Sequence, residues 1–69
     1  MKISARNVLR GDVVSVTKGA TTSHVKIEIA PGSVVTAAIT NEAVEQLGLK
    51  VGMPAMAVIK ASDVLVGIE

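Results

Sequence analysis

The sequence contains no cysteine and no aromatic residue, and one histidine stands among its 69 residues. The missing cysteines exclude disulfides, and a lone histidine without cysteine cannot build a structural zinc site. The missing aromatics remove the side chains on which single-stranded nucleic acids stack. Because so small a domain usually needs a disulfide, a metal or oligomerisation for its stability, we expect it to oligomerise.

Charge and hydropathy narrow the class of protein further. Seven Lys and Arg stand against six Asp and Glu, a formal net charge of +1 without a basic block, which predicts no nucleic-acid or membrane partner. No apolar run approaches the roughly 20 residues that span a bilayer, and no leader is recognisable, so we expect a cytoplasmic protein. Apolar residues still form 49% of the chain. Part of this surface should therefore face another subunit.

Turn residues divide the first forty residues into predicted strands. These strands are Ser4–Leu9, Gly11–Thr17, Ser23–Ala30 and Ser33–Thr40. The segment Arg10-Gly11-Asp12 is expected to end the first strand, and Pro31-Gly32 is a turn signal. Residues 25, 27 and 29 of the third strand are apolar and alternate with polar residues 24, 26 and 28, which is typical of a half-buried strand.

A short helix is predicted after residue 40. Thr40 or Asn41 offers an N-cap, Glu42 adds a negative charge to the first turn, and an apolar stripe of Ala43, Val44 and Leu47 ends at Gly48. Further strands are expected over Ala55–Lys60 and Val64–Ile68. Five or six short strands around one short helix predict a mainly β fold. We expect a single domain, residues 1–69, with a small closed or partly open barrel of the OB type.

Hydrogen-bond donors gather in three stretches, Ser4-Ala5-Arg6-Asn7, Ala38-Ile39-Thr40-Asn41 and Ile59-Lys60-Ala61-Ser62. An oxyanion without a proton only accepts hydrogen bonds, so its site needs donors. Cationic side chains, hydroxyls and backbone N–H groups beside small residues meet that need. The donors of this kind are Ser4, Ala5, Arg6, Thr40, Lys60, Ala61 and Ser62. This pattern indicates anion binding.

Each donor also has a simpler explanation. Thr40 is suited to cap the helix, Arg6 and Lys60 to be solvated strand cations, and Ser4 and Ser62 to end strands or turns. Spacing alone leaves both interpretations open. His24 is interpreted as a surface residue of its strand in preference to a ligand.

The stretches Ser4-Ala5-Arg6-Asn7 with Gly11, Ala38-Ile39-Thr40, Leu47-Gly48-Leu49-Lys50-Val51-Gly52 and Ile59-Lys60-Ala61-Ser62 resemble, in order and spacing, the molbindin (Mop) family of molybdate-binding domains of the TOBE type. The resemblance covers essentially the whole chain. It implies an OB-like barrel that forms a homo-hexamer, a trimer of dimers, with molybdate or tungstate bound between subunits and no cofactor.

The resemblance also implies how the site is divided. Its residues would be the seven donors named above, with Ser4–Arg6 from one subunit and the Thr40 and Lys60 segments from another. Family members can carry a second kind of site near the threefold axis. For it we have only a guess, the donor-rich turn with Gly19, Thr22 and His24.

Storage or homeostasis of the oxyanion is the function we expect, and two alternatives stay open. The domain could be a regulatory or oligomerisation module acting with a partner protein. An OB-fold nucleic-acid binder is disfavoured by the missing aromatics and the low charge. We expect no enzyme, because the sequence shows no pair of carboxylates, no cysteine, and one histidine without an evident nucleophile beside it.

Overall fold

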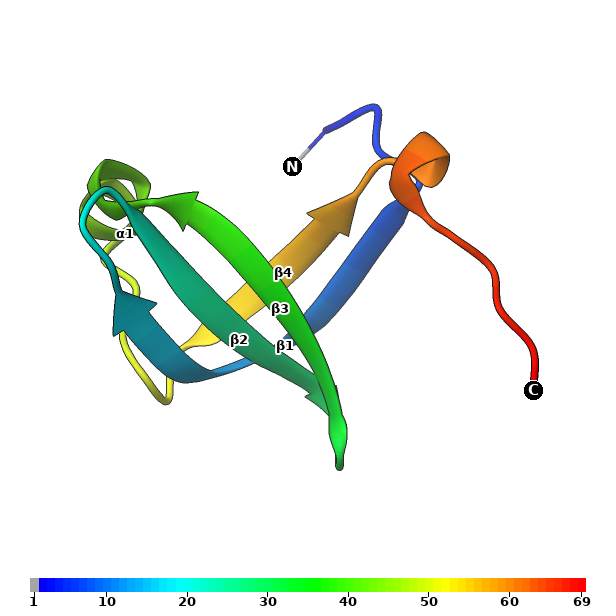
Figure 1. Cartoon of the computed structure of the whole chain (residues 1–69), viewed down its shortest axis with the longest axis horizontal. Coiled ribbons are helices and arrows are strands. Elements are labelled where there is room, and N and C mark those ends of the chain that lie inside the picture. The colour runs from blue at the N-terminus through cyan, green and yellow to red at the C-terminus, as the bar shows by residue number, and fades with distance from the viewer. Residues whose placement is uncertain (1) are drawn as a thin grey trace.

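The structure, a computed structural model, describes residues 2–69. Along the chain its elements are β1 (Asn7–Lys18), β2 (Thr22–Ala30), β3 (Ser33–Thr40), α1 (Asn41–Leu47), β4 (Pro54–Ile59) and a 3₁₀ turn, η1 (Ala61–Asp63). The strands form one antiparallel sheet in the order β3-β2-β1-β4. Figure 1 shows that the sheet is bent into a half-barrel whose free edges are β3 and β4. The predicted mainly β, OB-like fold is confirmed, with four strands in the described part instead of five or six.

Strand β1 replaces two of the predicted strands, so the expected break at Arg10-Gly11-Asp12 was wrong. The first half of β1 pairs with β4, and its second half pairs with β2. Gly11 lies where β1 and β2 approach closely, because a Cβ atom built on it would overlap the carbonyl oxygen of Glu28. A glycine inside a strand often marks such a close approach of two backbones. Here it permits the close crossing and does not end the strand.

The core is small and lies on the concave face. It consists of Val13, Val25, Ile27 and Ala57. The alternation predicted for residues 23–30 is confirmed, because residues 25 and 27 are buried and 29 is half-buried, while 24, 26 and 28 are exposed. One wall of the core is fixed by the turn before β4: Val13 N donates to Met53 O (2.9 Å), and Gly52 N donates to Val13 O (2.8 Å).

The predicted turn and helix ends are also confirmed. Pro31 and Gly32 join β2 to β3, and Gly32 has φ 79°, a value that favours glycine. The Thr40 hydroxyl accepts a hydrogen bond from Ala43 N (3.1 Å) and so caps α1. The helix ends at Gly48, which has φ 64°.

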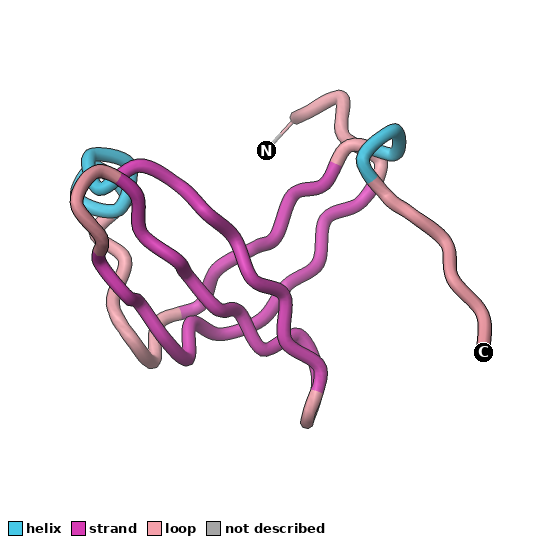
Figure 2. Tube along the Cα trace, viewed as in Figure 1, coloured by secondary structure: helices cyan, strands magenta, loops and turns pink. Residues whose placement is uncertain are grey.

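The last predicted strand, Val64–Ile68, is absent from the fold of one chain. After η1 these residues run outward without a strand partner, as Figure 2 shows. Leu65, Val66 and Ile68 are 93%, 93% and 95% exposed. A run of apolar residues forms a strand only where a sheet edge pairs with it, and η1 turns the chain away from the free edge of β4. The prediction was therefore wrong for the isolated chain.

Candidate functional site

The first and third donor clusters lie side by side at one end of the sheet. Asn7 pairs with Ile59, and Asn7 Nδ2 donates to Ile59 O (3.2 Å). Arg6 directly precedes this pair and Lys60 directly follows it, so the two cations flank the same end of the β1–β4 ladder (Figure 1). Both side chains are exposed, and neither takes part in the side-chain hydrogen bonds found within residues 2–69. We call this end of the sheet, which carries Arg6 and Lys60, the cationic end.

The η1 turn adds hydroxyl and backbone donors to this cationic end. Asp63 N donates to Lys60 O (2.9 Å), and Val64 N donates to Ala61 O (3.3 Å). Ala61 and Ser62 therefore occupy the start of a helical turn, where backbone N–H groups have no partner within the turn. Ser62 is exposed, as is Ser4 just before β1. Asp63 is exposed in the same turn, so donors are not the only groups there.

Thr40 lies at the opposite end of the sheet. It ends β3 opposite Thr22, beside the helix α1, and all 12 residues of β1 separate this end from the cationic end (Figure 1). Within one chain, Arg6 and Lys60 therefore lie at the same end of the sheet, and Thr40 lies at the other end. A hydroxyl has one proton to donate and two lone pairs. Thr40 thus caps α1 by accepting, and its proton remains able to donate to an anion.

Asn41 has a role that the sequence did not reveal. Its Nδ2 donates to Gly19 O (3.0 Å) and Ala20 O (3.3 Å), and its Oδ1 accepts from the buried Ser23 hydroxyl (2.5 Å). Its backbone N donates to Thr21 O (2.9 Å). Asn41 therefore joins the β1–β2 turn to the start of α1. Nothing in the local sequence indicated this, because the partners lie about twenty residues away.

The residues guessed for a second site fall into two places. Gly19 N donates to Thr22 O (2.9 Å), which closes the β1–β2 turn close to Thr40. His24 is exposed on the outer face of β2, opposite Thr17 and Ala38. Gly19 and Thr22 thus adjoin the Thr40 end, and His24 lies farther along the outer face.

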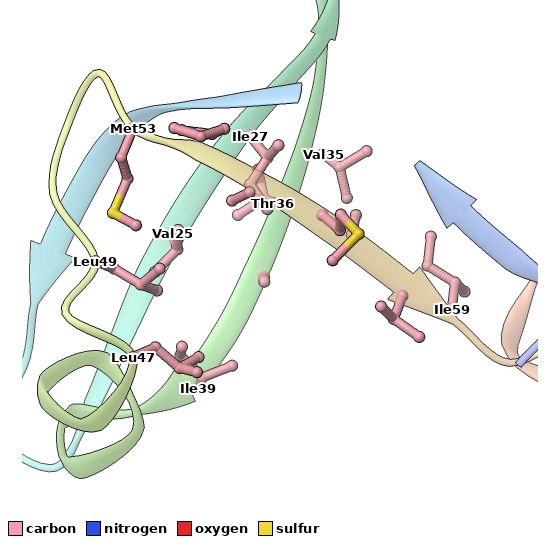
Figure 3. Close-up of a pocket in the computed structure, with 15 residues that line it drawn as sticks. Val25, Ile27, Val35, Thr36, Ile39, Leu47, Leu49, Met53 and Ile59 are labelled. Atoms are coloured by element: carbon pink, nitrogen blue, oxygen red, sulfur yellow. The ribbon is translucent and has the colours of Figure 1, made fainter. Parts of the chain in front are cut away.

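An apolar groove of about 650 Å³ lies on the concave side of the sheet. Val25 and Ile27 line it from β2, β3 and β4 form its two sides, and Leu49 and Met53 lie at one end (Figure 3). None of the seven predicted oxyanion donors lines it. Its apolar walls offer nothing to a doubly charged anion, so the groove and the anion donors are separate features.

Three further features of residues 2–69 bear on function. In that range no group of three or more His, Cys, Asp and Glu residues is placed to hold a metal ion, and no helix is long and apolar enough to cross a membrane. The sheet does bring two carboxylates together, because Asp12 of β1 faces Glu28 of β2. Both are exposed. The sequence alone did not reveal this pair, because it does not show which residues of the two strands face each other.

Comparison with known proteins identifies the family. The model of the TOBE domain matches residues 3–66. A probable molybdenum-pterin-binding protein of Haemophilus influenzae is 48% identical over 69 residues, with all of both chains covered. The structure of MopII from Clostridium pasteurianum superposes with a TM-score of 0.90 at 45% identity, over 97% of this chain and 100% of that chain.

A longer protein contains the same fold. The cytoplasmic molybdate-binding protein ModG, in a structure with molybdate bound, matches with a TM-score of 0.94 at 43% identity. The match covers all of this chain and 49% of ModG. The fold and these matches define a TOBE domain. The chain belongs to this family and, within it, to the molybdenum-pterin-binding (Mop) proteins, as its sequence motifs predicted.

Proposed function

We propose that this chain is a non-enzymatic protein that binds molybdate or tungstate between the subunits of a homo-oligomer. Support comes from its whole-length similarity to a molybdenum-pterin-binding protein and to MopII, and from the molybdate bound by ModG. The proposed ligand set consists of Ser4, Ala5, Arg6, Thr40, Lys60, Ala61 and Ser62.

The observation that carries the proposal is the separation of Thr40 from the cationic end. All groups that bind one tetrahedral oxyanion must lie within hydrogen-bond distance of its oxygens, about 3 Å. Thr40 and the Arg6–Lys60 pair lie at opposite ends of a 12-residue strand in a molecule whose longest extent is 34 Å. One anion cannot touch both ends of one chain. If the three clusters bind the same anion, then at least two copies of the chain contribute to the site. Thr40 would come from one copy, and Arg6, Lys60 or both would come from another.

The chemistry of the donors suits this anion. Arg6 can present two parallel N–H groups to two oxygens, and Lys60 adds a compact positive charge. Thr40 and Ser62 each add an O–H donor, and Ala61 leaves its backbone N–H accessible at the start of η1. Because molybdate, tungstate and sulfate carry no proton near neutral pH, each of these contacts is a donor facing an acceptor.

The proposal also covers the assembly of the subunits and the role of the protein in the cell. We infer a single Mop domain over residues 1–69, a hexamer built as a trimer of dimers, and a cytoplasmic role in storage or homeostasis of the oxyanion. An anion that binds only the oligomer stabilises it by mass action. Molybdate should therefore lower the protein concentration below which the oligomer dissociates.

Calorimetric titration of the oligomer with molybdate, tungstate, sulfate and phosphate tests the proposal. We expect heat of binding with molybdate or tungstate. Arg6→Ala and Lys60→Ala should each weaken binding by at least about 1.5 kcal/mol, the lower end for a charge-assisted hydrogen bond. His24→Ala, a change of an exposed residue on the outer face, is the control and should not alter the affinity. Absence of heat with both metal oxyanions would refute the proposed function, and unchanged affinity in both cation variants would refute the site.

A further inference from the structure

The end of the sheet that carries Thr40 has little apolar packing of its own. Helix α1 has no buried residue, and its contact with the core is made by the half-buried Val44. Residues 19–22 of the β1–β2 turn, which lies beside α1 in Figure 1, are all exposed. Seven residues are too few for a helix that is stable without tertiary contacts. Hydrogen bonds must therefore supply much of the order at this end.

Asn41, which directly follows Thr40, makes these hydrogen bonds. Its backbone N donates to the carbonyl oxygen of residue 21 (2.9 Å), and its Nδ2 donates to those of residues 19 (3.0 Å) and 20 (3.3 Å). Its Oδ1 accepts from the hydroxyl of Ser23, which is 1% exposed. Ser23 faces Ile39, the residue before Thr40, across the β2–β3 ladder. Asn41 thus ties the start of α1 both to the exposed turn and to a buried position of β2.

The same bonds determine where the Thr40 hydroxyl lies. Its oxygen accepts from Ala43 N (3.1 Å), so its proton is the group left to donate to an anion. The direction of this proton depends on the first turn of α1, because Ala43 belongs to that turn. Asn41 belongs to it as well and anchors it to the sheet. Without this anchor, the first turn and the Thr40 hydroxyl can move together relative to the sheet.

We propose that Asn41 is a positioning residue of the oxyanion site, because it holds the Thr40 hydroxyl in place before the anion binds. A donor that is already fixed loses less freedom when the ligand arrives, and this preorganisation increases affinity. Asn41 does not touch the anion and acts through Thr40. The inference deepens the proposed function and rests on it, since it requires Thr40 to be a ligand of the anion.

A double-mutant cycle, measured by calorimetric titration of the full chain with molybdate, tests this role. Thr40→Val removes the hydroxyl, keeps the branched shape and should weaken binding about tenfold, as expected for a hydrogen bond to a charged acceptor. Asn41→Ala should weaken binding about threefold or more, because Thr40 keeps its hydroxyl but not its fixed position. The double variant should bind within about twofold of Thr40→Val, because Asn41 then has no donor to position.

A residue that only stabilised the fold would give a different result. Val16→Ala is the matched control, because it removes a half-buried contact with the core and leaves the Asn41 hydrogen bonds in place. It should lower Tm, yet at a temperature where all variants are folded it should change the affinity for molybdate less than about twofold. Equal losses of affinity in Val16→Ala and Asn41→Ala, or fully additive losses in the cycle, would overturn the positioning role.

Asn41→Asp keeps the proposal testable if Asn41→Ala does not fold. Its carboxylate still accepts from the buried Ser23 hydroxyl but cannot donate to the carbonyl oxygens of residues 19 and 20. The added charge repels the anion with or without the Thr40 hydroxyl, so the cycle with Thr40→Val cancels this contribution. We expect the loss caused by Asn41→Asp to be at least about threefold smaller in the Thr40→Val background. A loss of the same size in both backgrounds would overturn the proposal.

Backbone order parameters from NMR relaxation give a readout that needs no anion. In both Asn41 variants, the values for residues 19–22 and 40–43 should fall from about 0.85, typical of a rigid backbone, towards about 0.6, while those of β4 stay unchanged. Order parameters that stay the same throughout would overturn the proposal. The titrations separate the two claims. Absence of molybdate binding by the unchanged chain refutes the proposed function and the inference with it, whereas binding that Thr40→Val weakens and Asn41→Ala does not refutes the positioning role alone.

Discussion

Replacing Asn41 with alanine should destabilise this protein far more than the position of Asn41 on a short, partly exposed helix would suggest. Asn41 accepts a hydrogen bond from the Ser23 hydroxyl and donates two to the carbonyls of Gly19 and Ala20. Ser23 is only 1% exposed. When Asn41 loses its amide, the Ser23 hydroxyl stays buried and water cannot readily replace the lost partner.

The magnitude follows from these three bonds. A buried polar group left without a partner costs about 1–3 kcal/mol. The two bonds to Gly19 and Ala20 are exposed, so their carbonyls can turn to water, and each should contribute no more than about 0.5 kcal/mol. Asn41→Ala should therefore lower the free energy of unfolding by about 1–4 kcal/mol. For a domain of this size, that corresponds to a fall in Tm of at least about 4 °C.

A double-mutant cycle isolates the buried bond. Ser23→Ala removes the donor and leaves the half-buried Asn41 oxygen, which water can reach, so this change should cost about 1 kcal/mol. In the double variant no hydroxyl is left unpaired. Its loss should fall short of the sum of the two single losses by at least about 1 kcal/mol.

Urea unfolding followed by circular dichroism measures these losses. All variants need the same protein concentration, because the stability of an oligomer depends on it. Gln46→Ala is the control: its exposed bond to Glu42 (3.2 Å) should contribute only about 0.2–0.5 kcal/mol. Strict additivity in the cycle, or an Asn41→Ala loss no larger than the Gln46→Ala loss, would refute the reasoning.

Two further changes test other features of the fold. Thr40→Ala should remove the cap of α1 at a cost of about 1 kcal/mol and should also weaken molybdate binding. Thr40→Ser is the control, because serine keeps both the acceptor and the donor. Equal behaviour of the two variants in urea unfolding and calorimetry would contradict the double role of Thr40. Gly11→Ala places a Cβ against the Glu28 carbonyl and should lower the free energy of unfolding by about 1–3 kcal/mol, and a change within about 0.5 kcal/mol would show that the two strands can separate locally without cost.

The parts of the fold that follow from local rules were predictable. The alternation around Val25 and Ile27, the turn at Gly32 and the helix ends at Thr40 and Gly48 depend on neighbours a few residues away. Gly11 was misread because a glycine can serve either a turn or a close crossing of two strands. Only the pairing of β1 with both β2 and β4 distinguishes these cases.

The failure at residues 64–68 has a different cause. Their apolar pattern is that of a strand, but a strand exists only where an edge receives it. The single chain does not present an edge to this segment, because η1 directs it outward.

The chemistry of this protein can be read from its sequence: a small, cysteine-free and aromatic-free chain, rich in apolar residues, with three clusters of hydrogen-bond donors. The positions of those clusters in space depend on the fold. Antiparallel pairing of β1 with β4 joins residues 52 positions apart, Asn7 and Ile59, and so brings Arg6 beside Lys60. The length of β1 places Thr40 at the far end. Distances between strands depend on which edges pair, and that is a property of the folded sheet and not of any local stretch of sequence.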